Sequence, residues 1–78
     1  MSDVFELMAK QHGSPLIARA DVGKLTGGAI SPKYCANMDS LGEGPKGRFV
    51  VGRRVVYKVD EFLTWLREHS KPATGGKL

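Results

Sequence analysis

Residues 26–58 read TGGAISPKYCANMDSLGEGPKGRFVVGRRVVYK, and this stretch contains the clearest structural signals of the 78-residue chain. At its centre, Ser31 can cap the free amide groups of a helix, and Pro32 at the first helical position loses no hydrogen bond. We therefore predict a helix over residues 32–41, which ends at the helix-breaking sequence GEGP of residues 42–45.

This helix has two faces of different character. Side chains with helical spacing toward a core are those of Cys35, Met38 and Leu41. Polar side chains project elsewhere, and they include Lys33, Asn37 and Ser40. One face is therefore free to contact a partner. Tyr34 lies between the two sets, and packing against the core fits its amphipathic ring as well as contact with a partner.

A basic segment follows the helix. Residues 48–51 and 55–58 are rich in β-forming residues and flank Gly52-Arg53-Arg54, which predicts a two-stranded hairpin. Between Gly44 and Val59 there are five bases and no acid: Lys46, Arg48, Arg53, Arg54 and Lys58. The rest of the chain holds seven bases and eight acids, so the whole positive excess lies here. Such a stripe is typical of a phosphate-contacting surface, although a solvated hairpin with protected edges fits the charge equally well.

A shorter helical segment precedes the first one. Val22 and Leu25 repeat at i and i+3, and Thr26-Gly27-Gly28 closes the segment, which predicts a helix of about two turns over residues 19–25. Two short helices joined in this way form a helix-turn-helix, whose second helix fits a major groove about 12 Å wide. The hairpin after it is a wing. The predicted fold is α+β and mostly helical, a winged helix-turn-helix with a two-stranded wing.

Helices also begin and end the chain. Residues 1–12 carry an apolar stripe and predict an extra short N-terminal helix packed on the domain. Asp60 is a good N-cap for a last helix of about ten residues, on which Phe62, Leu66 and His69 recur at i, i+4 and i+7. We therefore expect one winged helix-turn-helix domain over residues 16–69, and a disordered tail over residues 70–78 that lacks periodicity.

These features, in this order and spacing, resemble the small winged helix-turn-helix proteins of the excisionase and prophage-regulator group, distant relatives of MerR-type DNA-binding domains. The resemblance covers residues 16–67. It rests on Thr26-Gly27, Ser31-Pro32, Gly42-x-Gly-Pro45, Gly52-Arg53-Arg54-Val55-x-Tyr57 and Asp60-x-x-x-x-Trp65-Leu66. The chain departs from the family at Ala18, where a hydroxyl cap is usual, and at Asp39, where a base is common. Asp39 would repel phosphate unless it pairs with a nearby base.

The resemblance implies double-stranded DNA as the partner, with the helix after Thr26-Gly27 in the major groove and the wing on the backbone or in the minor groove. It makes Ser31, Lys33, Tyr34 and Asn37 candidate groove contacts, and it makes Arg53 and Arg54 the wing tip. The chemistry of the residues agrees, because Asn bonds adenine, Lys donates to guanine and Arg forks onto phosphate. Lys46, Arg48 and Lys58 complete the candidate DNA-binding set.

Catalytic and metal sites lack the residues that they need. His12, Cys35 and His69 have no ligand spacing, and the glycine pairs lack the Lys-Ser/Thr of a phosphate loop. We therefore expect no enzyme activity, no metal, no cofactor and no small-molecule substrate. A lone cysteine fits a reducing cytosol, and no apolar run is long enough to span a bilayer. The expected location is the cytoplasm, without membrane contact.

Two functions compete on this basis. The first is sequence-specific DNA binding, by a bacterial or prophage transcriptional regulator or by an excisionase-like recombination factor whose copies can associate on DNA. The second is a winged-helix adaptor that contacts protein, such as a phage packaging or assembly component. Binding that is insensitive to salt would identify the adaptor.

Overall fold

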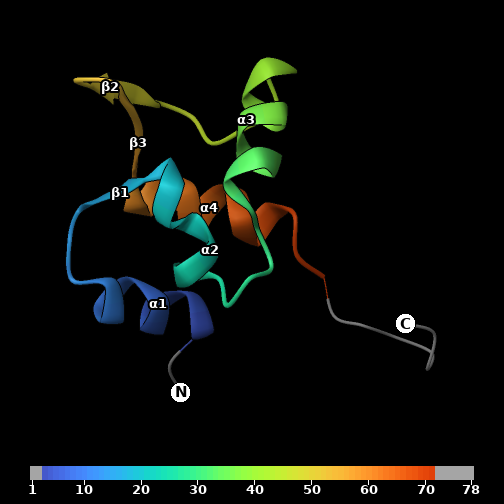
Figure 1. Ribbon diagram of the computed structural model, residues 1–78. Helices are drawn as coiled ribbons and strands as arrows, with labels where there is room; N and C mark the ends of the chain where they lie inside the picture. Colours follow the sequence, from blue (N-terminus) through green and yellow to red (C-terminus); the bar gives the residue numbers. More distant parts are fainter. Residues whose placement is uncertain (1–2, 72–78) are drawn as a thin grey trace.

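A computed structural model describes residues 3–71 of the chain (Figure 1). Its elements, in chain order, are α1 (Val4–His12), β1 (Leu16–Ala18), the 3-10 helix η1 (Arg19–Asp21), α2 (Val22–Leu25), α3 (Pro32–Ser40), β2 (Phe49–Val51), β3 (Arg54–Lys58) and α4 (Val59–Glu68). The predicted α+β class is therefore confirmed. The strands form a three-stranded antiparallel sheet in the order β1-β3-β2.

The sheet contains one strand more than predicted. β1 pairs with β3, so the expected two-stranded wing is the outer part of a three-stranded sheet. Ile17 lies opposite Tyr57 and both are buried, whereas Leu16 is exposed. A strand of three residues is too short to show the alternation by which strands are recognised in a sequence. The turn of the hairpin is also shorter than predicted, because Arg54 belongs to β3 and pairs with Val51.

The helix predicted over residues 19–25 is divided. η1 forms the first turn and α2 only the second, with no side-chain cap at Ala18. The missing cap and the low helix propensity of Gly23 agree with this weak helix. Thr26 closes the turn that follows, because its hydroxyl donates to the carbonyl of Val22 at 2.8 Å and accepts from the amide of Ile30 at 3.0 Å.

α3 begins as its sequence predicts and ends at Ser40, one residue earlier than predicted. The Ser31 side chain accepts a hydrogen bond from the amide of Tyr34 at 3.0 Å, and Pro32 occupies the first turn. Leu41 is the exception, because it caps the helix and is 68% exposed instead of reaching the core.

α4 supplies the largest part of the core. Its buried side chains are Val59, Phe62, Leu63, Trp65 and Leu66. They pack against buried residues of the other elements, namely Ile17, Val22, Cys35 and Tyr57. The expected N-cap at Asp60 is wrong: α4 begins at Val59, and Asp60 lies in its first turn, where a negative charge suits the helix dipole.

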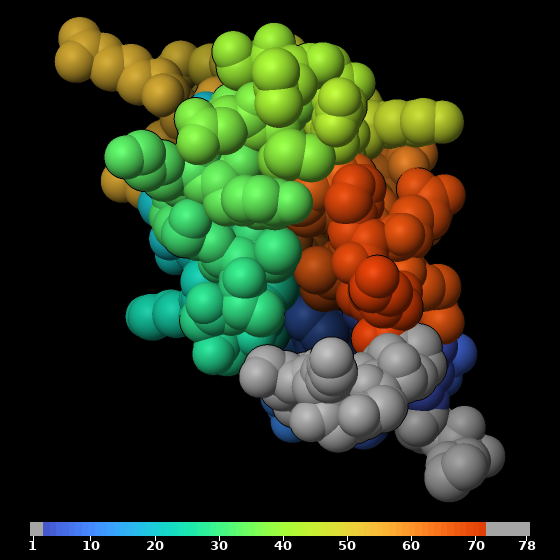
Figure 2. Space-filling model, turned by 90° about the vertical axis from the view of Figure 1, so that its right-hand side faces the viewer, coloured from blue at the N-terminus to red at the C-terminus, as the bar shows by residue number. Residues whose placement is uncertain are grey.

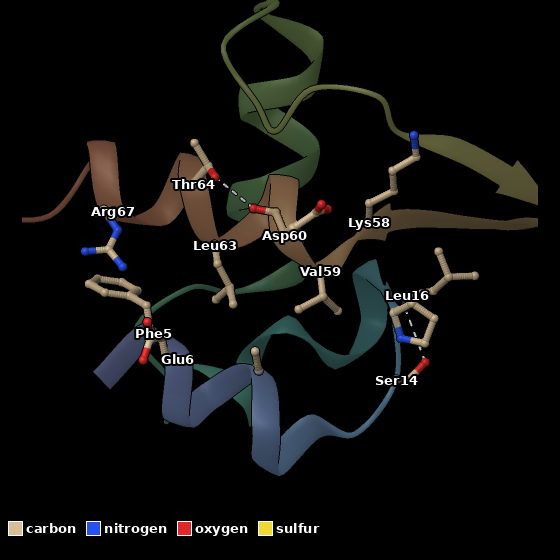
Figure 3. Close-up of a pocket in the computed structure, with 12 residues that line it drawn as sticks. Phe5, Glu6, Ser14, Leu16, Lys58, Val59, Asp60, Leu63, Thr64 and Arg67 are labelled. Atoms are coloured by element: carbon tan, nitrogen blue, oxygen red, sulfur yellow. Dashed lines mark hydrogen bonds between the residues drawn. The ribbon is translucent and has the colours of Figure 1, made fainter. Parts of the chain in front are cut away.

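α1 packs against α4 at the end of the molecule away from α3 and the hairpin (Figure 1). Asp3 caps α1 and pairs with Arg67, whose guanidinium lies 4.6 Å from the ring centre of Phe5 (Figure 3). The Ser70 hydroxyl, at the start of the predicted tail, donates a hydrogen bond to the Leu66 carbonyl of α4 at 2.7 Å. Residues 72–78 of that tail lie outside the described residues. In residues 3–71, no helix is long and apolar enough to cross a membrane.

Candidate nucleic-acid interface

A shallow hollow joins the N-terminus of α3 to the hairpin. Its walls come from η1 and the residue before it, from the start of α3 and from the hairpin: Ala18, Arg19, Ala20, Pro32, Arg53, Arg54 and Val55. We call this feature the α3–wing hollow. Arg53 and Arg54 of the predicted wing tip thus lie beside Pro32 at the start of α3, whereas none of the four groove candidates lines the hollow.

The four groove candidates are exposed on α3 or at its cap: Ser31, Lys33, Tyr34 and Asn37. In Figure 2, α3 forms a ridge (green) beside α4 (orange-red), and gold side chains of the hairpin extend beyond it. The position of Tyr34 fits both packing against the core and contact with a partner. Its ring centre lies 6.3 Å from that of Trp65, yet the residue is 41% exposed.

The five bases of the basic segment are all exposed, but they do not form one cluster. Arg53 and Arg54 line the α3–wing hollow. Lys58 lies at the opposite end of β3 and lines a groove between α1 and α4 with Asp60 and Leu63 (Figure 3). Lys58 is therefore separated from the other candidate contacts, because a strand of five residues carries its two ends far apart.

A buried polar cluster joins α3 to the wing. Asp39 is only 6% exposed, and its Oδ2 accepts hydrogen bonds from Nη2 of Arg19 and from the hydroxyl of Tyr57, each at 2.6 Å. Arg19 also donates from Nε to the Tyr57 oxygen at 3.0 Å. Three side chains from α3, η1 and β3 thus close a triangle. Charge-assisted hydrogen bonds of this length are strong, and they fix the angle between α3 and the hairpin.

The triangle also accounts for the charge of Asp39. The predicted repulsion of phosphate does not arise at the surface, because the carboxylate is buried and paired with Arg19. Burial raises the pKa of Tyr57, and its hydrogen bond to Asp39 raises it further, so the phenol remains a donor. The pKa of Arg19 is also raised, and its hydrogen bond to Tyr57 is the largest cause.

The loop after α3 requires a glycine at position 44 of its GEGP sequence. A Cβ atom at this position would lie 2.0 Å from Oδ1 of Asp39, so the loop after α3 can pass the carboxylate only where there is no side chain. Pro45 beside it is buried. Just before Gly44, the Glu43 carbonyl accepts a hydrogen bond from Nε1 of Trp65 at 2.7 Å.

Sequence reasoning missed Arg19 and Tyr57 as partners of Asp39. One signal was available, since Asp39 follows Cys35 by four residues and therefore shares its face of α3. Cys35 is buried as expected, and burial raises the pKa of its thiol. A carboxylate on that buried face requires a cationic or hydroxyl partner from another element.

In the part of the chain that the structure describes, no three His, Cys, Asp or Glu residues gather closely enough to hold a metal ion. Comparison with models of known protein families finds no match, and comparison with curated protein sequences finds none either.

Proposed function

We propose that this chain binds double-stranded DNA sequence-specifically, with α3 in the major groove and the β2–β3 wing on the backbone or in the adjacent minor groove. The observation that carries the proposal is the α3–wing hollow. Its lining includes Arg53 and Arg54 of the wing and Pro32, the first residue of the helix that carries the groove candidates. Base-reading and phosphate-binding groups then contact one duplex from one end of the protein.

The charges support this assignment. Lys46, Arg48, Arg53 and Arg54 are exposed along the loop and the wing, while Asp39, the acidic residue of α3, is buried and paired. A DNA phosphate backbone that approaches this surface therefore meets lysine and arginine side chains, and no exposed carboxylate of α3 opposes it. Asn37 and Lys33 offer the donors and acceptors that distinguish base pairs in the major groove.

Binding of this kind serves two roles equally well. A transcriptional regulator needs only to occupy its operator, and an accessory factor of site-specific recombination needs only to occupy and shape its site. Association of neighbouring copies on the DNA is compatible with both roles. An integrase gene beside the coding gene would favour recombination, and a divergent promoter would favour regulation.

Selection from a pool of random duplexes tests the proposal directly. After several rounds of retention on the immobilised protein, we expect one shared sequence to be enriched. A Lys33→Ala, Asn37→Ala variant should still retain DNA but should enrich that sequence less, because base contacts set sequence choice. A wild-type pool without any enriched sequence would contradict sequence-specific binding.

A second candidate, the protein-binding adaptor, is favoured by the outer strand of the sheet. β2 is an edge strand in which Phe49, Val50 and Val51 are all exposed and apolar. An open edge of this kind can pair with an extended segment of another protein. This function predicts capture of a protein partner that is insensitive to salt, together with no retention of DNA.

A further inference from the structure

One atom of the buried polar cluster is not satisfied by the triangle. Oδ2 of Asp39 accepts two hydrogen bonds, whereas the buried Oδ1 has no hydrogen-bond donor among the described residues. A buried carboxylate oxygen without a donor is costly. The groups that surround Oδ1 therefore decide how its charge is compensated.

Two residues adjoin Oδ1. Gly44 closes one side, since even a Cβ atom there would lie 2.0 Å from the oxygen. On another side, Nη1 of Arg48 lies 3.7 Å from Oδ1, an ion-pair distance slightly longer than a hydrogen bond. The Arg48 side chain is 48% exposed, whereas that of Asp39 is 4% exposed. Arg48 thus contacts a buried charge while about half of its surface stays open to a ligand.

We propose that Asp39 is a positioning residue for DNA binding, which holds Arg48 through Oδ1 so that the free N–H groups of Arg48 bind a backbone phosphate. The inference rests on the proposed function and names a further part of the same site. Arg48 moves inward by a fraction of an ångström to complete the hydrogen bond to Oδ1. One guanidinium then bridges a buried carboxylate and a phosphate.

The chemistry of arginine suits this bridge. A guanidinium carries five N–H donors in a fixed plane, so it can serve two anions at once, whereas a lysine ammonium is a single point charge. A side chain that is already held in place loses less conformational freedom on binding. Lys46 provides a contrast on the same loop, because it is exposed and pairs with no acid among residues 3–71.

A double-mutant cycle tests the coupling. The affinity for a fluorescein-labelled random-sequence duplex is measured by anisotropy for Arg48→Lys in the wild-type background and in the Asp39→Asn background. In the wild-type background we expect Arg48→Lys to weaken binding about tenfold, because the ordered bridge is lost. In the Asp39→Asn background the same change should have an effect within about twofold. An equal loss in both backgrounds would overturn the proposal, because Asp39 would then act only through the fold.

A second comparison avoids any dependence on Asp39→Asn, should that variant melt early. In the wild-type background, Arg48→Lys should bind as weakly as Arg48→Ala, whereas Arg53→Lys should keep most of its affinity because Arg53 has no carboxylate to bridge among the described residues. If Arg48→Lys keeps its affinity as Arg53→Lys does, the bridge is wrong while DNA binding stands. If the wild-type protein does not bind the duplex, the proposed function itself fails.

Discussion

Asn37 is the residue whose side chain is best suited to read a base. It is exposed on α3, and a carboxamide can accept from and donate to adenine at the same time. Asn37→Ala should reduce the free-energy difference between a selected site and random DNA by about 1–3 kcal/mol. Competition binding with the two duplexes measures this difference. The matched control is Gln11→Ala, which removes an exposed amide from α1. A uniform loss on both duplexes would show that Asn37 reads no base.

Tyr57 should make the protein less stable as the pH rises into the alkaline range. A tyrosine in an unfolded chain loses its proton near pH 10, by order of magnitude, whereas the raised pKa of Tyr57 keeps it protonated in the folded protein. Above about pH 10 the folded state therefore binds more protons. The stability that Tyr57 contributes is complete below that pH and falls by about 1.4 kcal/mol per pH unit above it.

Tyr57→Phe should remove this dependence. At neutral pH the variant is less stable by about 1–3 kcal/mol, because Asp39 loses a donor, but its free energy of unfolding should fall less steeply above about pH 10. Urea titrations across that range measure both effects. Tyr34→Phe, which alters an exposed ring, is the control and should keep the wild-type slope. Identical slopes for Tyr57→Phe and wild type would contradict the role given to the buried phenol.

Single residues were predictable where a local rule governs them. The Ser31 cap is confirmed because capping depends only on the residues that follow. Contacts between distant residues were not predictable, and Arg19 and Tyr57 meet Asp39 across 20 and 18 positions of the chain. The predicted burial of Leu41 is wrong, because this residue caps the end of α3 and is exposed. DNA contacts by individual side chains remain predictions.

At the scale of elements, two glycines test how α2 and the loop after α3 are built: Gly44 is crowded by Asp39, whereas Gly23 has space for a side chain. Gly44→Ala should destabilise the protein by about 1–3 kcal/mol, because its Cβ would meet the buried Asp39 carboxylate, which Arg19 and Tyr57 hold by hydrogen bonds. Gly23→Ala should stabilise it by about 0.5–1 kcal/mol, because alanine favours α2 and its Cβ would meet only the Ile30 carbonyl at 3.6 Å. Thermal and chemical denaturation measure both changes. Equal effects of the two substitutions would contradict this assignment.

Elements with strong end signals were predicted well and short ones poorly. α1, α3 and the hairpin have the expected positions, because each combines a periodic pattern with a cap or a glycine turn. β1 escaped prediction because its three residues show no period, and its strand conformation depends on pairing with β3. α2 is shorter than expected because a single turn of helix, like β1, depends on contacts with other elements.

For the molecule as a whole, the distribution of positive charge over the surface is what relates the fold to the proposed DNA binding. The positive excess predicted from the sequence lies partly beside α3 and partly, at Lys58, in the groove between α1 and α4. The sequence could locate the bases along the chain but not around the molecule. Arg53 and Arg54 are the two that the fold brings to the N-terminus of α3.

These two arginines should matter to DNA affinity and not to folding. Both are exposed at the tip of the hairpin, so the Arg53→Ala, Arg54→Ala variant should keep its stability within about 0.5 kcal/mol. Thermal melts check this expectation. The control variant is Lys10→Ala, Lys71→Ala, which removes the same charge from α1 and from the residue that follows Ser70. That control should leave the affinity for DNA close to the wild-type value.

A salt titration of DNA affinity tests the central claim most directly. Each phosphate that the protein neutralises releases condensed cations, so the logarithm of the wild-type binding constant should fall linearly with the logarithm of salt concentration. In the Arg53→Ala, Arg54→Ala variant the slope should be smaller by about 2, with weaker binding to specific and random duplexes alike. A wild-type affinity that does not change with salt, or a folded variant with the wild-type slope, would contradict DNA binding through α3 and the wing.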